Sequence, residues 1–310
     1  MTTPPGLAIV IATRHREQLL ARTLESVAGS KLPAALTEVV VIENGGETAS
    51  RTIVEAMSGR LPVRYMSTPE GNKSRALNAA LRDAAADMIC FLDDDVRIDH
   101  QTIDGYAAGA TKYGRGHYFS GPLVAEWELE PQEWLKPYLP PSAKGWDLGD
   151  HEVYVDRAVF IGSNWAAFRD DLLSAGGFDE HIGPGTPAGA IGDETELQQR
   201  MLRAGNRGVY LPHARIWHHV ARSSCDFEWA RLRQRRTGVT SGLLGTPPYW
   251  RSVPRGPAGL ALIGVLFAKV AVARALGWSE ERRVHVEMVS AYVSGYVKGR
   301  RLAAHRKPRG

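Results

Sequence analysis

The stretch "DMICFLDDDV" at residues 87–96 places three consecutive aspartates directly after an apolar run. Short, nearly continuous apolar runs are typical of strands that a fold covers on both faces. Repulsion disfavours neighbouring carboxylates unless a cation, hydrogen-bond donors or open water relieves it. The stretch therefore predicts a buried strand that ends either in a binding site or in a solvated loop of aspartates that caps a following helix.

Three similar runs come earlier in the chain, "LAIVIAT" (7–13), "EVVVIEN" (38–44) and "VRYMST" (63–68). The segments between the runs have apolar residues at helical spacing or are rich in helix formers. This alternation predicts an α/β fold with a doubly wound, mostly parallel sheet. Because ligands of such sheets bind beyond the carboxyl ends of the strands, the residues after each run are the candidates for a site.

The residues at the carboxyl end of each predicted strand, called the strand exits below, are polar. A turn or a helix cap explains each exit taken alone, but four polar exits that meet at one edge favour a shared site. The chain lacks a GxGxxG motif after the first strand and lacks a P-loop, which argues against dinucleotide enzymes and NTPases. The candidates are Thr13, Arg14 and Arg16, then Glu43 and Asn44, then the loop at 68–78, and finally Asp93, Asp94 and Asp95.

Asp93 and Asp95 are two positions apart, so their side chains leave a strand on the same side. Two carboxylates in that arrangement suit Mg²⁺ or Mn²⁺, which prefer oxygen ligands and commonly bind the phosphates of a substrate as well. Basic side chains at the other exits could contact the same phosphates. These basic candidates are Arg14, Arg16, Lys73 and Arg75.

The composition sets wider limits. A chain of 310 residues with 44% hydrophobic content fits one large α/β domain with an extension, or two domains. The two cysteines, Cys90 and Cys225, exclude a disulfide framework and favour a reducing cytoplasm. Neither a secretory signal nor an uninterrupted membrane span is expected, and the apolar segment 258–278 would be a buried helix or would lie on a bilayer surface.

The net charge is +4, and the excess of basic residues is concentrated late in the chain, in segments 231–236 and 299–310. Such segments suit acidic phosphates, anionic lipid or nucleic acid, or else form a solvated helix face and a frayed tail.

Several further motifs follow in a fixed order and spacing, although each alone is weak. They are "VIATRHR" (10–16), "VVVIENGG" (39–46), "EGNKSRALNAAL" (70–81), "FLDDDV" (91–96), "GSNWAAFRDDLLSAGGFDEHIG" (162–183), "GDETELQQRMLRAG" (192–205) and "YLPHARIWHHV" (210–220). Together they make the chain similar to the family 2 glycosyltransferases, which have the A-type nucleotide-sugar fold. The resemblance runs from about residue 7 to about residue 240.

The resemblance implies a mostly parallel mixed sheet and a division of the chain into two domains. The glycosyltransferase domain would occupy residues 1–240, with a nucleotide-sugar-binding half at 1–100 and an acceptor-binding half at 101–240. A C-terminal helical extension would occupy residues 241–310.

The resemblance also implies roles for the strand exits. Thr13, Glu43 and the loop from Asn72 to Arg75 would surround the base and ribose of the donor, and Asp94 would belong to the same substrate-binding group. Asp93 would approach the ribose or the metal, and Asp95 would ligate the Mn²⁺ or Mg²⁺ that bridges the two phosphates.

An acidic pair in the family, usually Glu then Asp, supplies the base that deprotonates the acceptor hydroxyl. Here the order is reversed, Asp193 then Glu194. Alignment on the following "TEL" puts Glu194 at the base position, with Asp193 as the alternative. The purely structural alternative is that both acids stabilise the N-terminus of a helix, which is worth roughly 0.3 to 1 kcal/mol.

Two more residues have both functional and structural interpretations. His218, in "WHHV", would complete the metal shell or would be an ordinary partly buried histidine. Trp165, in "GSNWAAF", would line the sugar or acceptor pocket or would pack in the core.

The expected function is that of a metal-dependent, inverting glycosyltransferase. The expected donor is a UDP- or dTDP-linked sugar, and the acceptor is a hydroxyl of a saccharide or of a lipid-linked glycan in polysaccharide synthesis. The alternatives are a nucleotidylyltransferase and a scaffold that binds nucleotide sugars without turnover. No nucleic acid partner is expected. The C-terminal helices would touch the cytoplasmic leaflet, or would pack on protein alone or on the second subunit of a homodimer.

Overall fold

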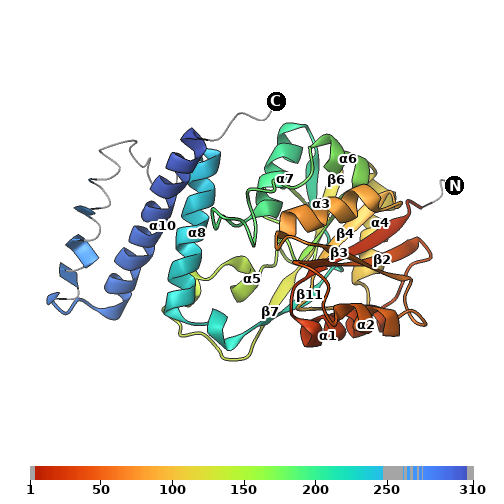
Figure 1. Cartoon of the computed structure of the whole chain (residues 1–310), viewed down its shortest axis with the longest axis horizontal. Helices are drawn as coiled ribbons and strands as arrows, with labels where there is room; N and C mark the ends of the chain where they lie inside the picture. The colour runs from red at the N-terminus through yellow and green to blue at the C-terminus, as the bar shows by residue number, and fades with distance from the viewer. Residues whose placement is uncertain are drawn as a thin grey trace. The chain divides into compact units, whose positions relative to one another are not determined.

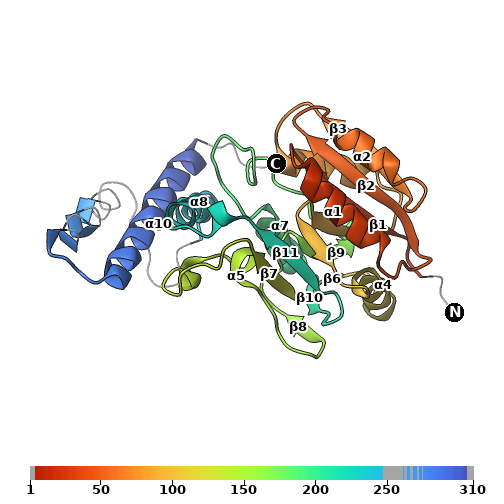
Figure 2. The ribbon, with the colours of Figure 1, turned by 90° about the horizontal axis from the view of Figure 1, so that it is seen from below.

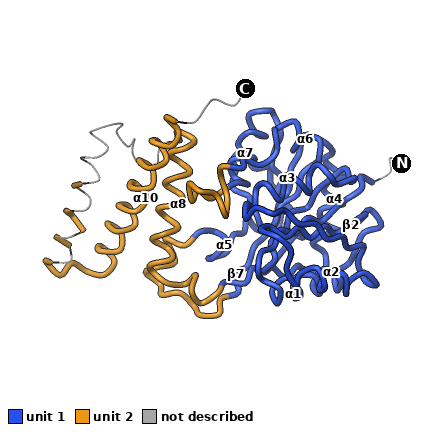
Figure 3. Tube along the Cα trace, in the orientation of Figure 1, with its two compact units in different colours: residues 1–126, 140–180, 193–220 blue, residues 127–139, 181–192, 221–310 orange. Residues whose placement is uncertain are grey.

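The computed structural model (Figure 1) describes residues 4–246, 261, 264–265, 268–270, 272–273 and 275–305. The chain divides into two compact units, drawn in two colours in Figure 3. Unit 1 comprises residues 1–126, 140–180 and 193–220, and unit 2 comprises residues 127–139, 181–192 and 221–310. The boundary expected between residues 240 and 241 falls inside helix α8 (Phe227–Leu244).

Unit 1 contains an eight-stranded sheet in the order β3-β2-β1-β4-β9-β6-β10-β8. The first four strands of this order are parallel, β9 is antiparallel to both β4 and β6, and β8 is antiparallel at the edge. This mixed, mostly parallel α/β sheet confirms the predicted fold class. The strands are β1 (Leu7–Thr13), β2 (Leu36–Asn44), β3 (Val63–Thr68), β4 (Met88–Asp93), β6 (His117–Ser120), β8 (Val153–Val155), β9 (Asn164–Phe168) and β10 (Arg207–Tyr210).

Helices cover both faces of this sheet (Figure 1 and Figure 2). Successive strand residues alternate between two buried clusters, as Ile9 and Val10 do, because side chains of a strand point to opposite faces. One cluster includes α1 (Glu17–Ala28), α2 (Ser50–Ala56) and α4 (Thr102–Tyr113). The other includes α3 (Lys73–Asp83), α6 (Arg169–Ser174) and α7 (Asp193–Arg203). The short α5 (Pro141–Lys144) also belongs to unit 1.

A second, three-stranded sheet has the order β5 (Val96–Ile98), β11 (Ile216–Val220) and β7 (Leu123–Trp127). β5 and β11 are antiparallel, and Arg97 pairs with Trp217. The Arg97 guanidinium lies 4.0 Å from the centroid of the Trp217 ring and 2.6 Å from Glu126 of β7. These contacts cross all three strands, so they fix the pairing of β11 with β5.

The described part of unit 2 is built around α8 and α10 (Glu280–Ala304), and it also contains the short 3₁₀ turns η1 (Lys136–Tyr138) and η2 (Arg222–Ser224). Asp226 caps α8 by accepting a hydrogen bond from the Trp229 amide. The backbones of α8 and α10 approach so closely that a Cβ on Gly295 would collide with the Arg235 carbonyl oxygen. None of the helices in the described ranges is long and apolar enough to cross a membrane. Much of segment 258–278, and residues 306–310 of the basic tail, lie outside the described residues.

Candidate active site

Two neighbouring strands bring the predicted residues together at the carboxyl edge of the large sheet. β1 ends at Thr13 and β4 ends at Asp93, and in the parallel pairing Ala12 lies opposite Asp93. Thr13 lies opposite Glu43 of β2. The strand order reverses direction at β1, which is where ligands of doubly wound sheets bind.

The three aspartates after β4 have individual partners. The Thr13 hydroxyl donates to Asp94 at 2.8 Å, and the Arg16 guanidinium donates to Asp94 at 3.1 Å and to Asp95 at 2.8 Å. The Lys73 ammonium pairs with Asp93. Asp94 is only 4% exposed, so the cluster is not the solvated loop that the sequence left open. Two cations face three carboxylates, which leaves a net negative charge for a further cation.

The residues predicted as metal ligands fit a divalent ion. Ligand atoms of Asp93, Asp95 and His218 lie within 4.8 Å of one another. Asp95 Oδ1 lies 3.4 Å from His218 Nε2. Two ligands about 2.1 Å from an octahedral ion are roughly 3 Å apart when they meet at a right angle, which is close to this separation.

Two atoms of this cluster also lack partners. Asp95 Oδ1 and His218 Nδ1 are buried and have no hydrogen-bond partner within the part of the chain that the structure describes. The 3.4 Å contact between the carboxylate and the imidazole is an ion pair only if the histidine is protonated. Buried polar atoms are normally satisfied, so an unpaired carboxylate oxygen facing a ring nitrogen points to a cation between them.

The small sheet carries His218 to the aspartates. β11 pairs with β5 so that His218 lies opposite Val96, the residue after Asp95. The His219 amide donates to the Asp95 carbonyl oxygen at 2.9 Å and extends this pairing. More than a hundred residues separate the two strands in the sequence, so the strand pairing, and not local sequence, makes the cluster.

Burial and charge shift several pKa values in the site. Burial and the charge of Asp95 raise the pKa of Asp94 to about 6, although Arg16 and Thr13 act in the opposite direction. Burial alone would raise the pKa of Asp93, but the Lys73 ammonium outweighs it and lowers that pKa. Burial would lower the pKa of Lys73, but Asp93 and Asp193 raise it. Lys73 is therefore a fixed positive charge between the aspartate cluster and the acidic pair.

The acidic pair begins α7. Asp193 is 5% exposed, and burial raises its pKa although Lys73 opposes the shift. Glu194 is half-buried, and its carboxylate lies against Gly162, where an added Cβ would be 3.3 Å from Oε2. Both acids lie in the first turn of the helix, so they also face its positive end, as the structural alternative requires.

The loop 72–75 is held by Glu180, a residue that the sequence did not single out. Asn72 caps α3 by accepting from the Arg75 amide, and its Nδ2 donates to the Glu180 carbonyl oxygen at 2.8 Å. Arg75 Nε donates to the Glu180 carboxylate at 3.0 Å, and Asn78 Nδ2 donates to it at 3.3 Å. The only sequence signal for Glu180 was its place in the "GGFDE" part of a family motif.

The remaining nucleotide-side candidates lie around the end of β2. Glu43 is fully buried and accepts hydrogen bonds from the Thr48 hydroxyl at 2.8 Å and from the His15 amide at 3.3 Å. Arg14 is exposed and lies against the backbone of Gly45 and Gly71.

Trp165 requires a correction, because it does not line an open pocket. It is 1% exposed, its ring centroid lies 5.0 Å from that of Phe91 in a stacked arrangement, and it also contacts Phe178. The pairing of β9 with β4 places Trp165 opposite Phe91 inside the core. Core packing, the alternative that the sequence left open, is therefore the role seen in the structure.

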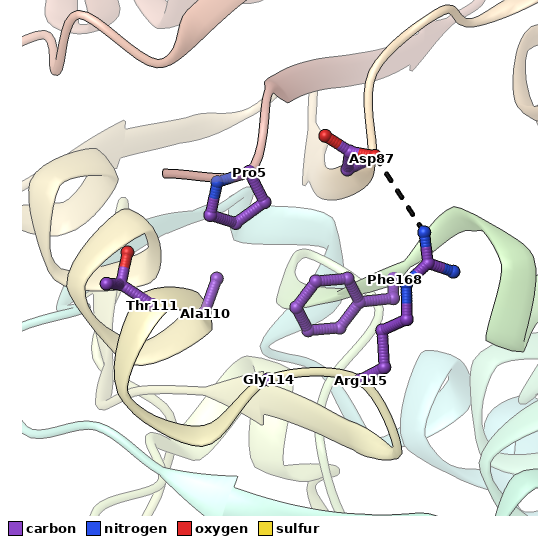
Figure 4. Close-up of a pocket in the computed structure, with 7 residues that line it drawn as sticks. All are labelled: Pro5, Asp87, Ala110, Thr111, Gly114, Arg115 and Phe168. Atoms are coloured by element: carbon purple, nitrogen blue, oxygen red, sulfur yellow. Dashed lines mark ion pairs between the residues drawn. The ribbon is translucent and has the colours of Figure 1, made fainter. Parts of the chain in front are cut away.

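A separate hollow of about 280 Å³ lies at the opposite edge of the sheet (Figure 4). Pro5 and Asp87, which precede β1 and β4, help to line it, as do Arg115 and Phe168. Arg115 pairs with Asp170 at 2.5 Å and with Asp87 at 3.8 Å, so acids already balance its charge. The residues that line this hollow include none of the acidic cluster, which lies where β1 and β4 end.

Comparison with solved structures agrees with this geometry. The chain superposes on the mannosyltransferase PcManGT from Pyrobaculum calidifontis, solved with GDP-Man and Mn²⁺, with a TM-score of 0.60 at 17% identity, covering 96% of this chain and 88% of that one. Residues 1–349 of S. aureus TarS superpose with a TM-score of 0.54 at 14% identity, covering 98% and 93%. The sheet with its acidic edge is thus the A-type glycosyltransferase fold.

Sequence comparison gives the family. The model of glycosyl transferase family 2 matches residues 8–174, so the chain belongs to that family and is a glycosyltransferase. The succinoglycan biosynthesis protein ExoM of Rhizobium meliloti is 27% identical over 74% of this chain and 72% of its own length. Validoxylamine A glucosyltransferase of Streptomyces hygroscopicus subsp. limoneus is 25% identical over 94% of this chain and 65% of its own length.

Proposed function

We propose that the protein transfers a sugar from a nucleoside-diphosphate sugar to an acceptor hydroxyl with inversion at the anomeric carbon, and that it needs Mn²⁺ or Mg²⁺. The observation that carries this proposal is the meeting of Asp93, Asp95 and His218, with an unpaired carboxylate oxygen, at the carboxyl edge of the sheet. A cation held there would stabilise the negative charge on the departing diphosphate. The Mn²⁺ and nucleotide sugar in the PcManGT structure support the same type of site.

The acidic pair supplies the base in this proposal. Glu194 accepts the proton of the acceptor hydroxyl while the hydroxyl oxygen attacks the anomeric carbon on the side opposite the leaving group. Its partial exposure supports this role, because an acceptor must reach the carboxylate. The buried Asp193 faces the charge of Lys73, and we propose that it holds this ammonium beside Asp93.

The donor side is formed by Thr13, Arg14, Arg16, Glu43 and the loop 72–75. In the structure Arg16 and Lys73 bind the acidic cluster, so we propose that they reach the diphosphate from that position. We propose that the donor is a UDP- or dTDP-linked sugar. A test of donor identity should also include GDP-linked sugars, because PcManGT was solved with GDP-Man.

A panel of UDP-, dTDP- and GDP-sugars tests the proposal directly. Release of the nucleoside diphosphate should require Mn²⁺ or Mg²⁺, should stop with EDTA, and should increase when saccharide or lipid-linked acceptors are added. A non-catalytic scaffold would bind a nucleotide sugar without releasing the diphosphate. A nucleotidylyltransferase would release pyrophosphate from a nucleoside triphosphate and a sugar phosphate.

We also propose that a lipid-linked acceptor brings the protein to an anionic membrane surface. Val265, Val272, Leu276 and Trp278 are exposed apolar side chains, and Lys269 is exposed in the same segment. Apolar and cationic side chains together suit a bilayer interface. Sedimentation with anionic and with neutral liposomes at low salt tests this proposal. If the protein binds neither kind of liposome, the membrane contact is wrong. The exposed apolar side chains would then pack on protein or on the second subunit of a homodimer.

A further inference from the structure

The segment 181–192, "HIGPGTPAGAIG", joins Glu180, which holds the loop 72–75, to Asp193 at the start of α7. It is rich in glycine and proline, yet its two ends are bonded together. The Gly183 amide donates to the Ala190 carbonyl oxygen at 3.2 Å, and the Thr186 hydroxyl donates to the Gly183 carbonyl oxygen at 2.9 Å. The segment is therefore a closed loop whose two ends continue along the chain into Glu180 and Asp193.

Contacts within unit 2 hold this loop against α8 and α10. The Thr240 hydroxyl of α8 accepts from the Ile191 amide at 2.9 Å and donates to the Ile191 carbonyl oxygen at 2.6 Å. Lys298 of α10 donates to the Ala188 carbonyl oxygen at 3.0 Å. Ile182 and Ala190 pack on Val239 in a small buried cluster.

The contact at Thr240 differs from the usual behaviour of a helical threonine. A threonine hydroxyl inside a helix commonly donates to the carbonyl four residues earlier, as Thr237 does to Arg233 at 3.0 Å. Thr240 lies 3.3 Å from the equivalent Arg236 oxygen, but its shorter bond is to Ile191. One hydroxyl thus satisfies both backbone groups of a residue two positions before the acidic pair.

We propose that Thr240 is a positioning residue for the acidic pair. By fixing the backbone at Ile191, it limits the loop conformations open to Asp193 and Glu194 and so sets where the Glu194 carboxylate meets the acceptor. Catalytic geometry is sensitive to shifts of this kind, since a misplacement of about 1 Å can lower a rate about a hundredfold. This inference rests on the proposed function.

The test compares Thr240→Val, which keeps the shape but removes the hydroxyl, with Thr240→Ser, which keeps the hydroxyl. Thr237→Val is the matched control on the same helix, because its hydroxyl donates to the Arg233 carbonyl oxygen within α8. For Thr240→Val we expect kcat to fall about 10- to 100-fold, with the KM for the donor and the affinity for Mn²⁺ with nucleoside diphosphate unchanged. Thr240→Ser and Thr237→Val should keep kcat close to the wild-type value.

Hydrogen exchange of peptides covering residues 181–192 provides a readout that needs no acceptor. Exchange in this loop should be faster in Thr240→Val than in the wild-type protein and unchanged in Thr237→Val. If Thr240→Val does not fold, Thr240→Ala takes its place in both measurements. A wild-type kcat in the folded variant overturns the proposal, whether or not the loop exchanges faster. If instead the wild-type protein transfers no sugar from any donor, the proposed function itself is wrong.

Discussion

At the scale of single residues, each aspartate at 93–95 has a different environment. Asp93 pairs with Lys73, Asp94 is buried under Thr13 and Arg16, and Asp95 has one oxygen bonded to Arg16 and one left unpaired among the described residues. The cluster is stable because fixed donors and cations offset most of its charge. Asp95 therefore keeps a buried oxygen that can bind a further cation beside Asp93 and His218.

The raised pKa of Asp94 predicts a pH dependence of stability in metal-free buffer. The unfolded pKa is about 3.9, whereas burial raises the folded pKa to about 6. The folded protein therefore holds a proton that the unfolded chain has lost, and this stabilisation, complete below about pH 4, disappears as the pH rises through about 6.

Asp94→Asn should remove this dependence. We expect its free energy of unfolding, relative to the wild-type protein, to increase by about 1 to 3 kcal/mol between pH 4 and pH 7. Urea unfolding of both proteins with EDTA measures the difference. A difference that stays constant over this range would contradict the raised pKa of Asp94.

Glu194→Gln tests the proposed base. Loss of the proton acceptor should lower kcat about 10²- to 10⁴-fold, while binding of Mn²⁺ with nucleoside diphosphate stays unchanged. Asp193→Asn should instead weaken donor binding, because it removes a charge that faces Lys73. Near-normal turnover by Glu194→Gln, with a large loss in Asp193→Asn, would assign the base to Asp193.

At the scale of elements, the small sheet determines whether the metal cluster forms. β11 carries His218 to Asp95 only if it pairs with β5 in the observed register, and Arg97 stabilises that register through Trp217 and Glu126. We expect these contacts to contribute about 1 kcal/mol together.

Arg97→Ala should therefore raise the Kd for Mn²⁺ with nucleoside diphosphate about fivefold, although Arg97 is not a ligand. Arg207→Ala is the matched control, because Arg207 lies 4.0 Å from the Tyr154 ring in a similar contact on the large sheet. Calorimetric titration measures both variants. Equal affinities in Arg97→Ala and Arg207→Ala would show that the small sheet does not need this contact to place His218.

The α8–α10 pair depends on close backbone approach. Gly295→Ala should destabilise the protein by about 1 to 3 kcal/mol, because the added methyl group would overlap the Arg235 carbonyl oxygen. Gly105→Ala is the control in another helix, since its Cβ would make ordinary contacts no closer than 3.5 Å. It should be neutral or stabilising by up to about 1 kcal/mol. Equal thermal midpoints for the two variants would argue against close α8–α10 packing.

At the scale of the whole molecule, the sequence predicted the strands, because each strand depends on a local pattern of apolar residues. The runs at 7–13 and 63–68 match β1 and β3, and the run at 38–44 lies within β2, because buried parallel strands have a strong apolar signature. The order of motifs led to the family. The roles of Asp93, Asp95 and Glu194 remain predictions until activity is measured.

Features set by long-range contacts could not be predicted. The use of Glu180 to hold Asn72 and Arg75, and the link between Thr240 and Ile191, join segments far apart in the chain. Trp165 was ambiguous because an aromatic residue after a glycine-containing turn fits a pocket wall and a core strand equally well. Its place opposite Phe91 was decided by strand pairing.

The central claim is that Asp93, Asp95 and His218 bind one divalent ion together with the donor diphosphate. Anomalous diffraction from crystals grown with Mn²⁺ and the nucleoside diphosphate found in the donor panel tests it most directly. We predict one manganese peak within about 2.3 Å of Asp95 Oδ1 and of a His218 ring nitrogen, next to the diphosphate. A diphosphate bound at this edge without manganese, or a manganese peak that contacts neither residue, would contradict the claim.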